Sequence, residues 1–453
     1  MTPHVTLRAR RLHATSLFVG IQVLPEASKA AEVAAVTAVA AAEGHHMILL
    51  LDTSGSMEGD RLEAVQRTLR IFVQHLKVED RLTLIEWNST AKVLCQACSD
   101  HAMLNTCIDG LQANGGTNLE AALLQLSAFR ETPVDAIFLL TDGHINQGQR
   151  SVATLGHLLQ ASLGSHAATA PLMALGFGED HNADMLQAFA IQTRGTYTFA
   201  DGDSKEMIPA ILGNLLGELE ARVGLRASVS WEGPTADTIA GVQCLELGAA
   251  PNATSYWMGN LIADKPQWVV CHMPADITGV CLTWTDPQTN EVHTCRVALE
   301  ATNQTDPDVL EQTHRVEVVR TLQSVKHRAH PMRVLPKLTA LEQTLQTSAV
   351  ASRPLVLQLL AEVKAAIQNV DSQGPVRQTS NMTTLGMQRG LLSLPLSQPL
   401  SLPLSQPLHD PLATLVMPDA HTLFSSPSQN RRRHEMVSGF SQTQIETPFH
   451  FPS

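Results

Sequence analysis

Several features that mark common functional classes are scarce in this sequence of 453 residues. Its formal net charge is −12, so it lacks the basic surplus that a general nucleic-acid-binding surface needs. No run of about 18 apolar residues occurs, and we therefore expect no transmembrane helix. The chain is also too long for one ordinary core, so two or three domains are expected.

A disulfide framework is not expected either, because the seven cysteines are odd in number and irregular in spacing. Cys95 and Cys98 form a C-x-x-C pair, but no second pair lies near it, so we interpret both as ordinary strand or loop residues rather than zinc ligands. The first 25 residues contain three arginines and no acid. This leaves a mitochondrial presequence as an alternative to two short strands, although we expect a cytoplasmic protein.

Between about residues 44 and 220, fully apolar segments alternate with amphipathic ones. The predicted strands are 47–51, 82–87, 92–95, 134–140, 171–178 and 196–200, and helices are predicted at 60–76, 118–129, 149–163, 183–193 and 204–220. Strands that are apolar on both faces and alternate with helices predict an α/β fold with a doubly wound, mostly parallel, Rossmann-like sheet. Functional sites in such sheets lie beyond the carboxyl ends of the strands.

The rest of the chain predicts smaller regions. Short strands with turns over 222–300 indicate a β-sandwich, which the strands in residues 1–26 are expected to join. Three amphipathic segments in 306–371 indicate a C-terminal helical bundle. Residues 372–453 contain SLPLSQPL twice and predict a disordered tail, with a docking peptide at its end as the alternative and a solvated basic cluster at 431–434.

Oxygen-bearing side chains follow two of the predicted strands and open one predicted helix. Asp52, Ser54 and Ser56 follow strand 47–51, Thr117 opens a helix behind two glycines, and Asp142 follows strand 134–140. Two carboxylates and three hydroxyls make an all-oxygen set, which suits a hard divalent cation such as Mg²⁺, Mn²⁺ or Ca²⁺. The protein groups supply a charge of only −2, so the cation could accept a carboxylate from another molecule.

The order D-x-S-x-S, G-G-T and T-D-G resembles the metal-ion-dependent adhesion site of the von Willebrand factor type A (VWA) family. The resemblance covers about residues 44–220. It implies that Asp52, Ser54, Ser56, Thr117 and Asp142 are metal ligands, the serines directly and the aspartates directly or through water. It also implies a non-enzymatic interaction protein, in which an Asp or Glu of a protein partner completes the coordination of the metal.

The regions after residue 222 resemble those of intracellular relatives, including plant RING-type ubiquitin ligases and proteins with a hedgehog/intein-like module. No RING-type Cys/His cluster and no intein-like block is visible in the sequence, so neither enzymatic activity is expected. Two other functions stay open. An adaptor in a ubiquitin-related or assembly pathway would use a structural metal and choose its partner through the bundle or the tail. A serine hydrolase would use Ser54 or Ser56 with His144 as base, but the G-x-S-x-G pattern lacks its first glycine.

Overall fold

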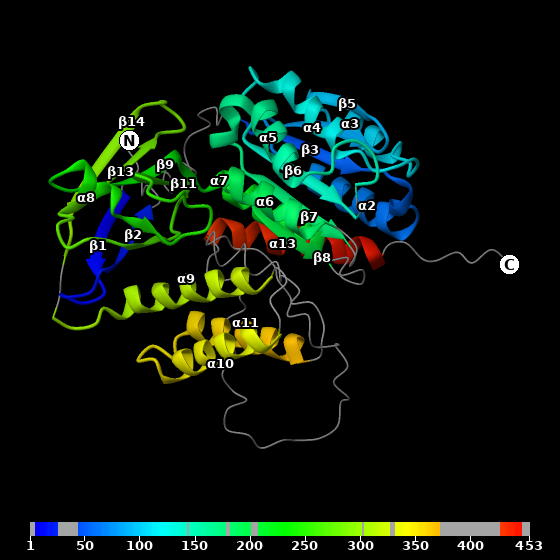
Figure 1. Cartoon of the computed structure of the whole chain (residues 1–453). Helices are drawn as coiled ribbons and strands as arrows, with labels where there is room; N and C mark the ends of the chain where they lie inside the picture. The colour runs from blue at the N-terminus through cyan, green and yellow to red at the C-terminus, as the bar shows by residue number, and fades with distance from the viewer. Residues whose placement is uncertain are drawn as a thin grey trace.

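The computed structural model describes residues 5–25, 44–142, 145–177, 182–200, 207–300, 303–326, 331–371 and 426–445. Figure 1 shows an α/β domain beside a unit of two antiparallel sheets, with a group of helices below them. The chain enters the two-sheet unit first, passes into the α/β domain after residue 44, and returns to the two-sheet unit at residue 222.

The α/β domain contains a six-stranded sheet in the order β5-β4-β3-β6-β7-β8. Every neighbouring pair is parallel except β4 and β5, so the prediction of a mostly parallel, doubly wound sheet is confirmed. The strands are β3 His46–Asp52, β4 Arg81–Trp87, β5 Ala91–Cys98, β6 Ala136–Thr141, β7 Leu172–Phe177 and β8 Thr196–Ala200. The helices are α2 Asp60–Gln74, α3 His101–Asp109, α4 Leu119–Gln125, α5 Val152–Leu163, α6 Ala183–Thr193 and α7 Met207–Glu220.

The central strand β3 is apolar on both faces because helices cover both faces of the sheet. Met47, Leu49 and Leu51 pack in a core with α2, α3 and α7, whereas Ile48 and Leu50 pack in a second core with α4, α5 and α6. Every residue of β3 is buried. The strand therefore delivers its last residue, Asp52, to the middle of the sheet edge.

The two-sheet unit consists of the sheets β1-β2-β12-β10 and β11-β9-β13-β14. One apolar core contains side chains from both sheets. The N-terminal β2 pairs antiparallel with β12, so segments separated by the whole α/β domain lie side by side. The strands are β1 Val5–Arg11, β2 Phe18–Pro25, β9 Arg222–Glu232, β10 Gln243–Cys244, β11 Ser255–Ile262, β12 Gln267–His272, β13 Gly279–Thr285 and β14 Val292–Ala298.

Helices α9 Pro307–Lys326, α10 Pro331–Thr347 and α11 Pro354–Asp371 pack around a further core. Leu247, from the loop after β10, belongs to this core and joins the helices to the two-sheet unit. The junction also contains a fully buried ion pair, in which Arg315 of α9 donates to both carboxylate oxygens of Glu246 at 2.6 and 3.0 Å.

The predicted disorder of residues 372–453 is wrong for part of this segment. Pro427–Ile445 form the helix α13, which packs on α7 (Figure 1). Gly217 of α7 permits this contact, since a Cβ there would lie 2.4 Å from the Cα of Gln429. The sequence concealed the helix because α13 is mostly polar, and its stability comes from tertiary packing.

The basic cluster at residues 431–434 is also not simply a solvated run of charge. Arg432 donates to Glu220 of α7 at 2.5 Å, and only 18% of its side chain is exposed. Ser428 and Arg431 reach the same carboxylate, and Met436 is fully buried in the α/β core. The pair of helices therefore combines an ionic contact with apolar burial.

Candidate metal centre

The first loop of the candidate site is held tightly over the end of β3. Ser54 N–H donates to Asp52 Oδ1 at 2.8 Å, and Thr53 N–H donates to the carbonyl of Trp87 at the end of β4 at 2.8 Å. The short turn Gly55–Met57 follows, and Met57 anchors it because its side chain is fully buried. These contacts position Ser54 and Ser56 above the strand ends.

The second loop lies against the first. Gly55 N–H donates to the carbonyl of Gly115 at 3.1 Å, and a Cβ on Gly55 would lie 3.4 Å from that oxygen, an ordinary van der Waals contact. Gly115 has a φ of +71°, which favours glycine. The left-handed bend between the two loops therefore occurs at Gly115 and not at Gly55.

The structure brings four of the five predicted ligands into direct or linked contact. The hydroxyls of Ser54 and Ser56 lie 3.1 Å apart, and Ser56 Oγ donates to Asp142 Oδ1 at 2.8 Å. Asp52 joins the set through its bond with the Ser54 backbone. Thr117 lies on the adjoining second loop, 3% exposed, and its N–H donates to Asn146 Oδ1 at 2.8 Å.

Asp52 is only 1% exposed, so its carboxylate is almost completely removed from water. Burial raises the pKa of its carboxyl to about 6, and the negative charge of Asp142 acts in the same direction. Hydrogen bonds from Thr141 and Ser54 oppose the shift. These donors are neutral, so they solvate the carboxylate without neutralising it.

Two further residues of the site were missed in the sequence analysis. Thr141, the last residue of β6, donates its hydroxyl to Asp52 Oδ2 at 2.5 Å. Arg61, in the first turn of α2, donates to Asp142 Oδ2 at 2.5 Å and to the Ser56 carbonyl at 3.2 Å. Thr141 could have been found from the T-D-G triplet, because β6 lies next to β3 and ends at the same edge of the sheet.

These residues fit a hard divalent cation. The donors are carboxylate and hydroxyl oxygens, and Asp52 is a buried acid whose described donors are neutral. Across the described residues there is no group of three or more His, Cys, Asp or Glu side chains that could hold a metal. A cation at this site would therefore depend on the hydroxyl oxygens as well as on the two aspartates.

Comparisons with known proteins identify the family to which the α/β domain is similar. Residues 45–199 match the von Willebrand factor type A domain family. An uncharacterised Synechocystis protein is 31% identical over 170 residues, a match that covers 36% of this chain and 39% of that protein. The Arabidopsis thaliana E3 ubiquitin-protein ligase WAV3 is 29% identical over 163 residues, covering 32% and 21%.

Human inter-alpha-trypsin inhibitor heavy chain H3 is 26% identical over 165 residues, covering 33% of this chain and 18% of that protein. The matched region thus spans well under half of each of these relatives.

Solved structures extend the likeness beyond the α/β domain at the level of fold. A von Willebrand factor type A protein from Catenulispora acidiphila has a TM-score of 0.57 at 13% identity and covers 87% of this chain and 98% of that one. The ArnB paralog VWA2 from Sulfolobus acidocaldarius has a TM-score of 0.57 at 15% identity and covers 85% and 98%.

No helix in the part of the chain that the structure describes is both long and apolar enough for a membrane span. The parallel sheet, the family match over residues 45–199 and the fold of the two solved structures lead to one conclusion. Residues 45–199 form a VWA domain, which lies between the segments of a two-sheet unit.

Proposed function

We propose that the VWA domain binds Mg²⁺, Mn²⁺ or Ca²⁺ through Asp52, Ser54, Ser56, Thr117 and Asp142. We further propose that an Asp or Glu of a protein partner completes the coordination. The carrying observation is the cluster that links Asp52, Ser54 and Ser56 to Asp142 at one edge of the sheet. A VWA domain commonly mediates metal-dependent protein interaction, which supports the same function.

The residues of this chain have separate roles in the proposal. Asp52 and Asp142 bring two negative charges from β3 and β6, and the serines and Thr117 bring neutral oxygens. The charges of the two aspartates formally balance a divalent cation, but Asp142 also pairs with Arg61, so the site as a whole would carry a positive charge. A partner carboxylate would be attracted to that charge, so recognition would depend on metal.

The test is partner capture by the full chain with and without Mg²⁺, read by mass spectrometry. We expect EDTA and Asp52→Ala each to abolish capture while the circular dichroism spectrum is retained. Asp109→Ala is the matched control, because Asp109 is a surface acid that pairs with Arg70. Partners that bind equally well in EDTA would remove the proposed mechanism.

We also propose that the protein is a cytoplasmic binding protein and not an enzyme. In support of this, the hydroxyls of Ser54 and Ser56 bond to each other and to Asp142, and among the described residues no histidine bonds to either serine. His144, the candidate base for a hydrolase, lies outside the described residues. A serine-reactive probe that labels Ser54 or Ser56 would contradict the proposal.

An adaptor with a structural metal is the second candidate, and the docking of α13 on α7 favours it, because it makes part of the C-terminal region a folded surface. Under this alternative, deletion of residues 373–453 abolishes partner capture while Mg²⁺ binding stays intact. Under the first proposal, capture survives the deletion and is lost with Asp52→Ala.

A further inference from the structure

Cys244 and Cys271 face each other across two strands of the two-sheet unit. Cys244 of β10 is the register partner of Cys271 of β12. At the next position, Leu245 N–H donates to the Val270 carbonyl at 2.9 Å, whereas Val270 N–H donates to the Glu246 carboxylate. Cys244 and Cys271 therefore occupy a non-hydrogen-bonded position, where opposed Cα atoms lie about 4.5 Å apart. Disulfides need a Cα separation of about 4.4–6.8 Å, so this position suits one.

Both thiols point to the same side of the sheet. Cys271 is fully buried in the core of the two-sheet unit, and Cys244 packs against that core while half-buried. Burial, followed by a hydrogen bond with Cys244, raises the pKa of the Cys271 thiol well above its usual value. Cys271 is consequently a protected thiol, while its neighbour Cys244 is the one that solvent can reach.

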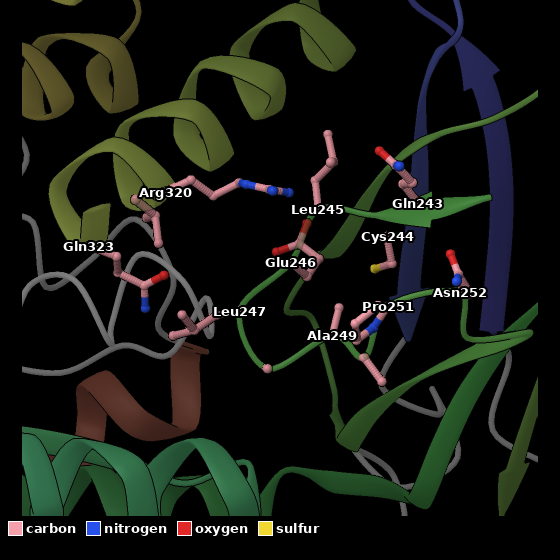
Figure 2. A pocket seen from close by; sticks show the side chains of 13 residues that line it. Gln243, Cys244, Leu245, Glu246, Leu247, Ala249, Pro251, Asn252, Arg320 and Gln323 are labelled. Atoms are coloured by element: carbon pink, nitrogen blue, oxygen red, sulfur yellow. The ribbon is translucent and has the colours of Figure 1, made fainter. Parts of the chain in front are cut away.

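A cavity gives access to Cys244. Its volume is about 400 Å³, and it lies between residues 243–252 and α9. Figure 2 shows the sulfur of Cys244 among the lining side chains, which include Glu246 and Arg320. Cys244 is thus the cysteine of the pair that lines a cavity.

The remaining cysteines do not have this arrangement. Cys281 and Cys295 lie on the neighbouring strands β13 and β14, but they are one residue out of register and so face opposite sides of their sheet. Cys95 of β5 and Cys107 of α3 also have thiols within hydrogen-bonding distance, but they are not partners across two paired strands, and Cys95 is only 5% exposed. Cys244 and Cys271 are directly opposed on paired strands, and Cys244 also lines a cavity.

We propose that Cys244 and Cys271 are a reversible dithiol–disulfide site whose oxidant is a small-molecule disulfide such as oxidised glutathione. The Cys244 thiolate attacks one glutathione sulfur, the S–S bond breaks, and one glutathione leaves with a proton. Cys271 then loses its proton and attacks Cys244 Sγ, and the second glutathione leaves as a thiol. Two protein thiols are oxidised and one disulfide is reduced, so electrons and protons balance.

The location gives this chemistry a structural consequence. The residues directly after Cys244 join three parts of the molecule: Glu246 binds Arg315 of α9, and the Leu247 carbonyl accepts from Arg194 at the end of α6 in the VWA domain at 2.7 Å. A covalent bond between β10 and β12 would hold the start of this junction. Oxidation should therefore protect residues 245–252 from proteolysis.

To test the proposal, the full chain is incubated in buffers of reduced and oxidised glutathione, and free thiols are then blocked by alkylation. Disulfide-linked peptides are identified by mass spectrometry. We expect a peptide pair joined through Cys244 and Cys271, with the loss of two hydrogens, to dominate under oxidising conditions and to vanish after reduction. Oxidation should slow cleavage within 245–252 several-fold.

Variants make the result decisive. Cys244→Ser and Cys271→Ser should each abolish the linked peptide and the slower cleavage, whereas Cys281→Ser, the matched control from another strand pair, should retain both. Three results would overturn the proposal: a glutathione adduct that stays on Cys244 without resolving, linked peptides that involve only other cysteines, or an oxidised protein that is cleaved as fast as the reduced one.

Discussion

Two buried carboxylates in this protein have opposite surroundings. Glu246, at the junction with α9, receives two hydrogen bonds from the Arg315 guanidinium and a third from the Val270 backbone at 2.8 Å. Asp52, at the edge of the VWA sheet, receives bonds from a backbone amide and a threonine hydroxyl, both neutral. The two acids are almost equally inaccessible, with exposures of 5% and 1%.

The difference indicates which carboxylate is structural and which is open to a ligand. A buried charge needs a counter-charge, and Glu246 has one from within the fold. Asp52 lacks an equivalent partner among its described donors, and burial raises the pKa of its carboxyl to about 6. In the proposed function, a cation from solution supplies the positive counter-charge for Asp52, as Arg315 does for Glu246.

Removing Glu246 from its ion pair with Arg315 should cause the largest change in the free energy of unfolding. Glu246→Ala leaves Arg315 buried without its partner, and we expect the free energy of unfolding to fall by about 3–5 kcal/mol. Urea denaturation measures it. Glu232→Ala is the matched control, because its pair with Arg296 is exposed and should contribute less than about 1 kcal/mol. Equal losses in the two variants would contradict the contrast.

Removing the charge of Asp52 should instead increase the free energy of unfolding. Asp52→Asn keeps an acceptor for Thr141 and removes a buried charge, so in EDTA at pH 7.5 the protein should become more stable by about 1–3 kcal/mol. Asp142→Asn should give no such gain, because it loses the ion pair with Arg61. A destabilised Asp52→Asn protein would show that the site does not need an outside cation.

Glu220 extends the comparison of buried and paired carboxylates to acid pH. Burial alone would raise the pKa of Glu220, but Arg432 and Lys77 outweigh it and lower the pKa to about 2, from an ordinary value of 4.5. A lowered acid pKa stabilises the fold above about pH 4.5, and this contribution is lost as the pH falls towards 2.

We therefore expect the amide protection of α13 to decrease across this window in hydrogen exchange corrected for pH. In Glu220→Gln the protection should be lower throughout and should lose this pH dependence. If both proteins respond to pH in the same way, Glu220 does not hold α13 in place.

The smallest expected effect concerns Arg61. Its guanidinium pairs with Asp142 but is 45% exposed, so it opposes a nearby cation only weakly. Arg61→Ala should tighten Mg²⁺ binding about 2- to 5-fold, measured by calorimetry. Arg70→Ala is the matched control, since Arg70 lies on the same helix with the same exposure and pairs with Asp109. Weaker binding in Arg61→Ala would mean that Arg61 helps to form the site.

Local patterns in the sequence determined the VWA domain. A strand buried on both faces can be recognised from its apolar run alone, and the end of that run located Asp52 at the edge of the sheet. The same reasoning located Asp142 directly after β6, where it accepts a hydrogen bond from Ser56. Ligand roles for these residues and for Thr117 stay predictions.

Tertiary structure alone decided the contacts between distant segments. The polar sequence of α13 carries no strong helical signal, and its docking depends on the close approach at Gly213 and Gly217 of α7 together with the Arg432–Glu220 contact and the burial of Met436. The opposition of Cys244 and Cys271 depends on strand register, which irregular cysteine spacing did not indicate. Chemistry near one strand end is encoded within a few residues, whereas register and helix docking are set by packing across the whole fold.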